Sequence, residues 1–470
     1  MGMVLAVFER EVIGLIGIGV LFLLLMLRMP VGLAMLTVGI GGNYFISLAM
    51  PAFKFLPFLK QFKTLLWGVV SNYELSVVPL FILMGLLASH ARLSNDLFAG
   101  FNALIGRFRG GVAMAAIGAC AGFGAVCGSS LATASTMGRV ALPELARLNY
   151  SPRLATGTLA AGGTLGILIP PSVALVIYAV IVEASVVDMF QAAIVPGLLA
   201  VVFFVVTIAV LVRLKPEFAP QTANLAPAER RRALWRLVPV LGIFGIIILG
   251  LGLGLFTPTP AAAFGTMIIL LYGLFLRFSG LGEGLSNEGL KNSFLDTAVT
   301  AGMIYFILFG AEVLKIFFAR AGLPALLAEW TSGSGIEPWL ILIAMLLLLI
   351  VLGCFMDSLA MILVVVPFLW PALVELNGGD YVTASSAVYG LSADDLKIWF
   401  GIIALVVVEL GLITPPVGLN VFIIASIAKH VSMGDVFRGV MPFFGVELIR
   451  IGLLLAVPGL CLVLPYYLSG

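Results

Sequence analysis

The chain has 470 residues, of which 62% are hydrophobic and 10% are charged. Soluble domains carry about 25% charged residues, so this composition excludes a soluble globular protein and requires a lipid bilayer as the solvent. The formal net charge of +2 is nearly neutral, and basic residues are spread over loops, so nucleic acid is not an expected partner. His90 and His430 are the only histidines, so a histidine-based metal site is not expected.

Long apolar runs, such as residues 12–27, 238–256 and 340–352, approach the length of about 20 residues that a membrane-spanning helix needs. We predict roughly ten spans plus two shorter paired segments. The run that follows Arg10 lacks a basic leader and a small-residue cleavage pattern, so we predict a retained first span rather than a signal peptide.

Basic residues predict the orientation of the chain, because cytoplasmic loops are enriched in Lys and Arg. With these residues in the cytoplasm, the N-terminus lies outside and the basic loop 213–236 separates two halves. The residues predicted to be cytoplasmic are Arg28, Arg92, Arg107, Arg109, Arg147, Arg153 and the cluster Arg213, Lys215, Arg230, Arg231, Arg232 and Arg236.

Two segments are too long for one span and too interrupted for two. Residues 111–145 carry GAVCGSS at their centre, with arginines at both ends, and predict a re-entrant hairpin that opens to the cytoplasm. Residues 339–372 surround GCFMDS and predict a second hairpin that opens to the outside. Each hairpin precedes a helix broken by a Pro-Pro pair, at 154–182 and 397–429.

The halves also repeat short motifs in the same order. FILMG at 81–85 matches FILFG at 306–310, an offset of 225, and the Pro-Pro motifs that begin at Gly166 and Gly411 are offset by 245. DMFQAAIVP at Asp188 matches DVFRGVMP at Asp435. We therefore predict an all-α integral membrane protein built from two inverted-topology repeats. The growing offset places a polar insertion at 377–395.

Interrupted helices inside a membrane expose backbone groups at a cost of several kcal/mol each, roughly, unless protein, water or ligand satisfies them. Paired interruptions in inverted repeats indicate a transporter site near the bilayer midplane. The predicted tip presents backbone N–H groups, which suit an anion, and hydroxyl and carbonyl oxygens, which suit Na⁺. Small-residue helix packing is the alternative explanation for the first tip. The predicted substrate-binding residues are Gly128, Ser129, Ser130, Thr133, Pro170, Pro171 and Asn420.

The Pro-Pro pairs remove backbone donors, so the carbonyls before them become candidate cation ligands, although a simple proline kink stays open as an alternative. Asp357, at the second tip, would cost about 2.5 to 3.5 kcal/mol at mid-bilayer, so we expect a cation or several donors beside it. The predicted Na⁺ ligands, some through backbone carbonyls, are Ser129, Ser130, Thr164, Gly166, Asp357, Ser358, Thr414 and Pro415.

Other charged residues in apolar surroundings are harder to assign. For Glu409, Glu312 and Lys315, a functional role, helix-to-helix pairing and proximity to an interface all stay open. Asp188, Asp435 and Glu447 are predicted to lie at loop or interfacial depth.

Three motifs resemble those of the large membrane subunit of tripartite ATP-independent periplasmic (TRAP) transporters, the DctM-like family. They are the tip Cys127-Gly128-Ser129-Ser130 and the Pro-Pro segments 165–172 and 411–420, and the resemblance spans essentially the whole chain. Cys127 stands where the family often has serine, and the polar stretch 377–395 is a second departure from its pattern.

The resemblance implies Na⁺-coupled, elevator-like uptake of an organic acid anion such as a C4-dicarboxylate or sialic acid, across a bacterial inner membrane. It implies two partners, a small DctQ-like membrane subunit and a periplasmic DctP-like solute-binding protein, and we expect no fused small subunit in this chain. It also predicts a division into scaffold helices of repeat 1 (1–95), a transport part of repeat 1 (96–212), a cytoplasmic linker (213–236), scaffold helices of repeat 2 (237–335) and a transport part of repeat 2 with the last span (336–470).

Three alternatives remain at this point. A single-component Na⁺/dicarboxylate symporter of related fold would take up its substrate without a binding protein. A gated channel would give steady conductance without accumulation. A membrane enzyme is less well supported, because the chain lacks a paired-carboxylate motif, a histidine cluster and a phosphate-binding glycine loop.

Overall fold

The computed structural model describes residues 10–27, 29–50, 52–220, 226–279, 284–333 and 335–468. Within these ranges the chain is helical and has no strand, so the predicted all-α membrane fold is confirmed. Arg28, the N-terminal nine residues and residues 221–225 of the predicted linker lie outside the described residues.

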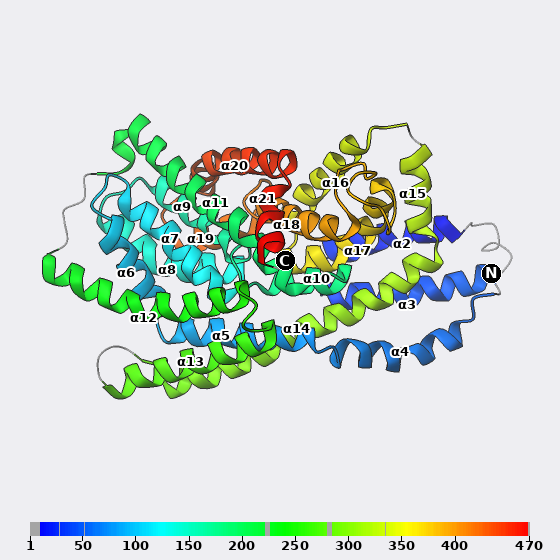
Figure 1. The fold of residues 1–470 in the computed structure, drawn as a ribbon, viewed down its shortest axis with the longest axis horizontal. Helices are drawn as coiled ribbons and strands as arrows, with labels where there is room; N and C mark the ends of the chain where they lie inside the picture. The colour runs from blue at the N-terminus through cyan, green and yellow to red at the C-terminus, as the bar shows by residue number, and fades with distance from the viewer. Residues whose placement is uncertain are drawn as a thin grey trace.

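The first half begins with α2 to α6, of which α3, α4 and α5 lie along the lower long side of the molecule in Figure 1. Helix α4 and the segment η1–α5 meet at an angle of 59°, as one broken span would. These elements are α2 (Arg10–Met26), α3 (Val31–Ala49), α4 (Phe55–Val70), η1 (Glu74–Ser76), α5 (Val77–His90) and α6 (Leu93–Ile105).

The first predicted hairpin and broken helix follow in the expected places. The hairpin consists of α7 (Gly111–Cys127) and α8 (Ser130–Arg147), which pack against each other. The broken helix consists of α9 (Pro152–Gly163), η2 (Thr164–Gly166) and α10 (Val173–Val182). After them come α11 (Val186–Leu214) and η3 (Pro216–Phe218).

The second half has the same order of elements. It begins with α12 (Pro227–Gly252), α13 (Pro258–Ser279), α14 (Asn287–Arg320) and α15 (Leu323–Gly333). The second hairpin is α16 (Pro338–Gly353) and α17 (Ser358–Asn377), and the second broken helix is α18 (Ala393–Gly411) and α19 (Leu419–Ile427). The chain ends with α20 (Met433–Ala456) and α21 (Gly459–Leu468).

By length and composition, seven described helices could cross a membrane, or up to eight if the bent pair counts as one span. This count leaves out shorter helices such as α2, with 17 residues, and includes α17, an arm of the second hairpin, so the roughly ten spans stay a prediction. The predicted single last span is also two helices, since Val457 leaves the helical conformation between α20 and α21. α21 then packs against α11 and α18.

Early helices of the two halves pack closely together. α14 lies against α3 and α5, and α13 lies against α5. Glycines permit this approach, since a Cβ at Gly42 would lie 2.3 Å from the ring of Phe317. Small residues at such positions let membrane helices pack through van der Waals contact. The scaffold and transport boundaries themselves stay a prediction.

Second halves of the broken helices pack across the repeats. α19 lies against α8 and α9 of the first half, and α10 lies against α17 of the second. Figure 1 shows the resulting groups above α5, α13 and α14, with α7, α8, α9 and α19 together on one side and α16, α17 and α18 on the other. The hairpins are therefore joined through each other's broken helix.

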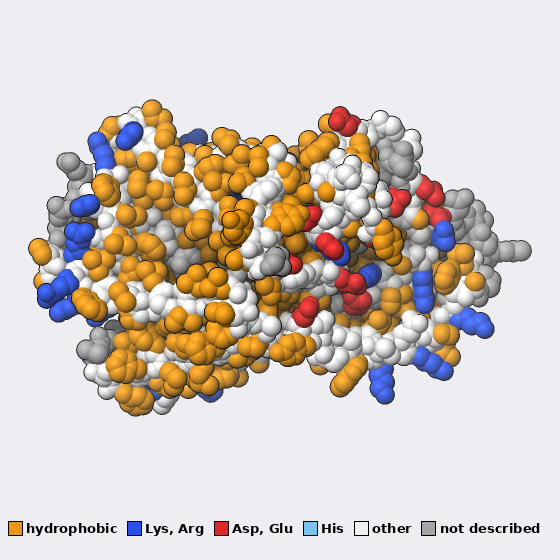
Figure 2. Space-filling model, viewed as in Figure 1, with side chains coloured by type: hydrophobic (Ala, Val, Ile, Leu, Met, Phe, Trp, Pro, Cys, Tyr) orange, Lys and Arg blue, Asp and Glu red, His pale blue; other side chains and the backbone are white. Residues whose placement is uncertain are grey.

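Hydrophobic side chains cover most of the visible face, while Lys and Arg lie at both ends and Asp and Glu lie only towards the right-hand end (Figure 2). Exposed apolar residues of α11, such as Leu198 (57%) and Val202 (54%), face outward along the middle. An apolar band between charged ends is the surface expected of a protein that spans a bilayer.

Glu447 corrects a prediction. It is buried within α20, not at loop or interfacial depth, and its carboxylate pairs with the fully buried Arg450. Arg450 also donates to the carbonyl of Pro196 on α11, at 3.0 Å. By contrast, Asp188 and Asp435 lie in the first turns of α11 and α20, where their backbone N–H groups are capped by Ser185 and Ser432.

The buried pair predicts a strong effect on stability. Arg450→Met leaves the Glu447 carboxylate uncompensated inside the helix bundle, a change that typically costs about 3 to 5 kcal/mol. We expect a clearly lower thermal unfolding midpoint for the purified chain in detergent. Arg438→Met, which removes an exposed arginine from the same helix, is the control. Equal midpoints for the two variants would contradict a structural role for the pair.

Candidate functional site

The first hairpin turns at Gly128 and Ser129. Gly128 has a φ of 59°, in the left-handed region that favours glycine, and ends α7. Ser129 is the N-cap of α8, and its Oγ accepts a hydrogen bond from the N–H of Ala132 at 3.4 Å. α8 then begins at Ser130 with its amino end in the protein interior.

The second hairpin turns between Cys354 and Asp357. Asp357 is the N-cap of α17 in extended backbone conformation, and its side chain makes no capping hydrogen bond. Its carboxylate therefore stands, partly exposed, at the amino end of a helix, where negative charge is favoured. Ser129 and Asp357 are counterparts in the two hairpins, and Ser130 and Ser358 are the helical residues that follow them.

Glu409 joins the two tips. This residue lies on α18 and is 1% exposed. One carboxylate oxygen, Oε2, accepts a hydrogen bond from Ser130 Oγ at 2.5 Å, and the other, Oε1, accepts one from Ser358 Oγ at 2.5 Å. Both serines are the first residue of their helix, so the amino ends of α8 and α17 converge on one carboxylate. Buried charge is stabilised by hydrogen bonds and positive helix ends of this kind.

The sequence left the role of Glu409 open, although a signal for it existed. By the offset of 245 between the Pro-Pro motifs, Glu409 is the counterpart of Thr164, a residue we did select. A carboxylate two residues before GLITPP therefore stands at a predicted ligand position. Glu312 and Lys315 lie instead on α14, which packs chiefly against α3 and α5.

Each hairpin also presses against the break of its own repeat. A Cβ at Gly124 of α7 would lie 2.6 Å from Cα of Gly166, and a Cβ at Gly166 would lie 2.7 Å from both the Ser129 carbonyl oxygen and Thr133 Oγ1. In the second repeat, a Cβ at Gly411 would lie 2.7 Å from Cα of Gly353. Equivalent glycines thus let hairpin and broken helix meet backbone to backbone in both halves.

Backbone groups at the second break find partners on the second hairpin. The N–H of Gly418 donates to the Cys354 carbonyl at 3.3 Å, and Cys354 Sγ donates to the Pro415 carbonyl at 3.4 Å. Thr414 Oγ1 donates to the Leu410 carbonyl at 2.6 Å, as Thr164 Oγ1 donates to a carbonyl one turn earlier in the first repeat. Both threonine oxygens keep lone pairs.

Two buried oxygens at the site have no hydrogen-bond partner. They are Thr133 Oγ1 and Asn420 Oδ1, and both residues are 0% exposed. The amide nitrogen of Asn420 reaches back to the Ala160 carbonyl at 3.5 Å, so α19 contacts α9 here. An orphaned buried acceptor is costly unless a ligand satisfies it.

The donor set at the site is made of hydroxyl, amide, carboxylate and carbonyl oxygens. Within the described residues, no group of three or more His, Cys, Asp or Glu is placed to hold a metal ion. Oxygen ligands of this kind suit a hard cation such as Na⁺.

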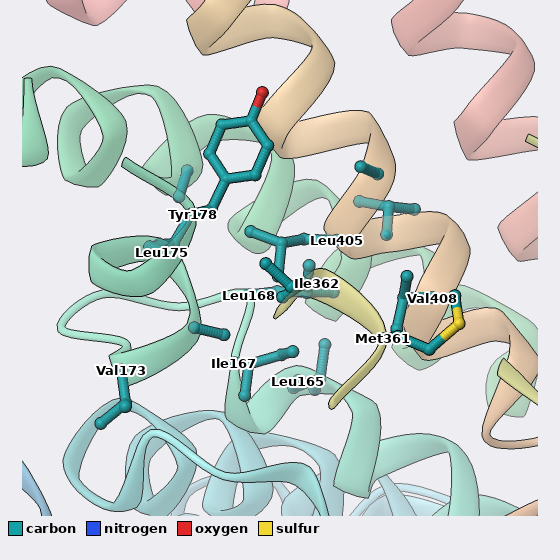
Figure 3. Close-up of a cluster of buried hydrophobic side chains, with 14 of the residues drawn as sticks. Leu165, Ile167, Leu168, Val173, Leu175, Tyr178, Met361, Ile362, Leu405 and Val408 are labelled. Atoms are coloured by element: carbon teal, nitrogen blue, oxygen red, sulfur yellow. The ribbon is translucent and has the colours of Figure 1, made fainter. Parts of the chain in front are cut away.

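An apolar cluster surrounds the first break (Figure 3). Leu165, Ile167 and Leu168 lie next to Met361 and Ile362 of α17 and Leu405 and Val408 of α18. Pro170 and Pro171 are buried in the same region, whereas Pro415 and Pro416 are exposed. The second helix break is therefore accessible from outside the protein, whereas the first is not.

The predicted residues form one connected region. It contains Gly128, Ser129, Ser130, Thr133, Thr164, Gly166, Pro170 and Pro171 from the first repeat, and Asp357, Ser358, Thr414, Pro415 and Asn420 from the second. Their roles in binding stay predictions. For Ser130 the structure adds a role that the sequence did not suggest, as a hydrogen-bond donor to Glu409.

A polytopic helical protein with two hairpins meeting two broken helices belongs to the class of membrane transporters. Residues 18–460 match the family model described as "Tripartite ATP-independent periplasmic transporter, DctM component". The chain therefore belongs to the DctM family, the large permease subunits of TRAP transporters, and is a transporter rather than an enzyme. It is a multi-pass protein of the bacterial inner membrane.

Characterised relatives agree with this assignment. The chain is 33% identical over 407 residues to the C4-dicarboxylate TRAP transporter large permease protein DctM of Pseudomonas aeruginosa, covering 86% of this chain and 89% of the relative. It is 30% identical over 411 residues to the sialic acid TRAP transporter large permease protein SiaM of Vibrio cholerae, covering 86% and 88%. An isethionate TRAP transporter permease protein, DctMQ of Oleidesulfovibrio alaskensis, is 26% identical, covering 85% of this chain and 59% of the relative.

Solved structures share the fold at low identity. The YdaH transporter of Alcanivorax borkumensis superimposes with a TM-score of 0.60 at 16% identity, covering 86% of this chain and 88% of that one. MtrF of Neisseria gonorrhoeae gives 0.52 at 13% identity, covering 86% and 84%. These likenesses support the helical transporter fold alone.

The bridge predicts that Glu409 holds the tips in place. Glu409→Leu removes both acceptors and leaves two buried hydroxyls unpaired, at about 1 to 3 kcal/mol each. We expect amide hydrogen exchange at residues 130–133 and 358–361 to speed up by about tenfold or more. Glu409→Gln can still accept from one serine and donate to the other, so its exchange should stay near that of the wild type. Unchanged exchange in the Leu variant would contradict the bridge.

Proposed function

We propose that this chain imports an organic acid anion together with Na⁺, and that a periplasmic solute-binding protein delivers the anion. The observation that carries the proposal is that both hairpin tips meet at Glu409 beside the helix breaks, while two buried oxygens on neighbouring helices, Thr133 Oγ1 and Asn420 Oδ1, have no partner. Relatives that transport C4-dicarboxylates, sialic acid and isethionate support an organic anion as the substrate.

The donor set of the site supports coupling to a cation. The hydroxyls of Ser130 and Ser358 already donate to Glu409, so they are not free to hold an anionic substrate. The buried groups that remain without a partner are oxygens, which suit a hard cation. A cation bound beside the tips offsets the charge of the substrate, and substrate binding then depends on Na⁺.

Thr133 Oγ1 and Asn420 Oδ1, which the sequence predicts to bind substrate, are here the best candidates for the cation's ligands, because they are buried and have no other partner. The carbonyl of Ser129 lies beside Gly166 and Thr133 and adds a further oxygen next to Thr133 Oγ1. One ion that enters across about 100 mV supplies about 2.3 kcal/mol to the transport cycle.

Thr133→Val tests this assignment cleanly. The substitution keeps the side-chain shape and removes an oxygen that makes no hydrogen bond within the protein, so stability should hardly change. We expect the Na⁺ concentration for half-maximal uptake to rise by about tenfold, because the cation loses about one charge-assisted contact. Thr156→Val is the control, because the Thr156 hydroxyl on α9 already donates to the Pro152 carbonyl at 2.7 Å. The same Na⁺ dependence in both variants would rule Thr133 out as a ligand.

Equivalent elements of the repeats adopt different contacts, which supports alternating access. In repeat 1, a Cβ at Gly85 of α5 would lie 2.7 Å from Cα of Cys127, so the first tip rests on α5. The counterpart glycine, Gly310 of α14, instead meets the Gly32 carbonyl of α3. Phe355, the counterpart of Cys127, is 51% exposed.

An inverted-repeat transporter reaches its opposite state when the two halves exchange conformations. In that state the second tip would rest on Gly310, and the first would leave Gly85. Pro170 and Pro171 would become accessible while Pro415 and Pro416 became buried. An elevator-like movement of both hairpins with their broken helices makes this exchange, since Glu409 ties the tips together.

Cysteine cross-linking tests the exchange. We expect Phe355→Cys and Gly310→Cys, in a background without the four native cysteines, to cross-link mainly during turnover with Na⁺ and substrate. The control pair combines Phe355→Cys with Gly302→Cys, two helical turns away on α14, and should stay unlinked. Equal cross-linking of both pairs, or of the first pair without turnover, would argue against the exchange.

A small membrane subunit completes the proposed system, and the longer DctMQ relative supports it. Uptake of radiolabelled C4-dicarboxylate, sialic acid and isethionate into liposomes tests the whole proposal. We expect accumulation only with the binding protein and an inward Na⁺ gradient. Na⁺-driven uptake without the binding protein would point to a single-component symporter, and conductance without accumulation would point to a channel.

A further inference from the structure

A basic cavity lies at the end of the molecule opposite the acidic side, away from the hairpin tips. Its volume is about 480 Å³, and it opens between the end of α6 and the start of α12, which pack against each other. These helices lie at the left-hand end in Figure 1, and the visible face of that end in Figure 2 carries Lys and Arg but no Asp or Glu. The residues that line it are Asn102, Ala103, Arg107, Pro227, Arg230, Arg231 and Leu234.

Three arginines and no carboxylate line the cavity. Arg230 is held in place, because its Nε donates to the Ala103 carbonyl at 3.1 Å. Arg107 lies over the ring of Phe108 with 5.0 Å between guanidinium carbon and ring centroid, and it is exposed, as is Arg231. One arginine is therefore anchored, and two more present their guanidinium groups beside it.

The start of α12 adds to the positive potential. α12 begins at Pro227, which lines the cavity, so the positive amino end of the helix lies there, while Glu229 in the same turn is not part of the lining. Helix amino ends and arginine guanidinium groups are the two protein features that most often bind phosphate. Here both occur at one cavity.

The surroundings place this cavity at a membrane boundary. Trp235 is 71% exposed and Phe108 is 52% exposed, as expected of aromatic residues at the level of lipid headgroups. Further along α12, Val238 (59%) and Leu241 (44%) are exposed apolar residues, suited to acyl chains. Ala103 and Leu234 give the cavity itself an apolar wall.

We propose that this cavity binds the phosphate of an anionic lipid, of the phosphatidylglycerol or cardiolipin type, in the cytoplasmic leaflet. The positive-inside rule places this arginine-rich end in the cytoplasm. Basic pockets between membrane helices on that side suit such headgroups. The lipid phosphate bridges α6 and α12, which belong to different halves of the chain, and so fastens the two halves together at this end.

Lipid titration of the purified chain in detergent, followed by native mass spectrometry, tests the site. We expect cardiolipin and phosphatidylglycerol to bind and phosphatidylcholine not to bind. The double variant Arg107→Gln/Arg231→Gln should weaken cardiolipin binding by about 30-fold, the effect of two interfacial charges. The double variant keeps Arg230, whose hydrogen bond to the Ala103 carbonyl joins α12 to α6. The thermal unfolding midpoint of the double variant should therefore match that of the wild type.

The matched control is Arg213→Gln/Arg232→Gln, which removes two exposed arginines from the same end of the chain but none from the cavity. It should bind cardiolipin as the wild type does. Equally weakened cardiolipin binding in both double variants would show a general effect of charge and would contradict a specific site in this cavity. If inorganic phosphate at low millimolar concentration displaces cardiolipin, the ligand of the cavity is a free anion and not a lipid. If the small subunit displaces the lipid, the cavity is a protein interface and not a lipid site.

Discussion

A carboxylate buried among apolar helices must be compensated, and the compensation of Glu409 ties this structure together. The only donors that reach its two oxygens among the described residues are Ser130 and Ser358, the first helical residues of two hairpins from different halves. Both hairpins are therefore fixed to α18, and through it to the second helix break. Breaking one hydrogen bond would leave a carboxyl oxygen and a hydroxyl unpaired in a medium where each is costly.

The same constraint explains why the tips are built as they are. A helix can present its amino end inside a membrane only where the chain breaks or turns back at that depth. At the tips the chain turns back, and Ser129 and Asp357 are the N-cap residues. Glycines at Gly124 and Gly353 then let each hairpin meet the adjacent break. Oxygens left over from this packing, on Thr133 and Asn420, are the ones available to a transported ion.

Much of this architecture can be predicted from the sequence because short local motifs determine it. The hairpin predicted at 111–145 is α7 and α8, Gly111–Cys127 and Ser130–Arg147, since glycines, serines and flanking arginines mark its turn and ends. The Pro-Pro pairs likewise mark both breaks. By contrast, the hydrogen bond between Ser130 and Glu409 joins residues 279 positions apart, and no local pattern encodes it.

The depth of single charged residues in the membrane is harder to predict, because it too depends on contacts between distant parts of the chain. Glu447 reads as interfacial until its partner Arg450, one turn later, is seen packed against the Pro196 carbonyl of another helix. Domain boundaries and ligand roles depend on movement and binding, which composition and spacing indicate only indirectly.

The central claim is that the two tips act as one unit through Glu409, and a double-mutant cycle on Na⁺-driven uptake tests it most directly. Ser130→Ala, Ser358→Ala and the double variant would be compared at equal amounts of reconstituted protein. The account predicts that each single change lowers uptake and that the double variant is little worse than either, because one lost hydrogen bond already frees the shared carboxylate. Losses in transition-state free energy that simply add would show that the tips work independently and would contradict the account.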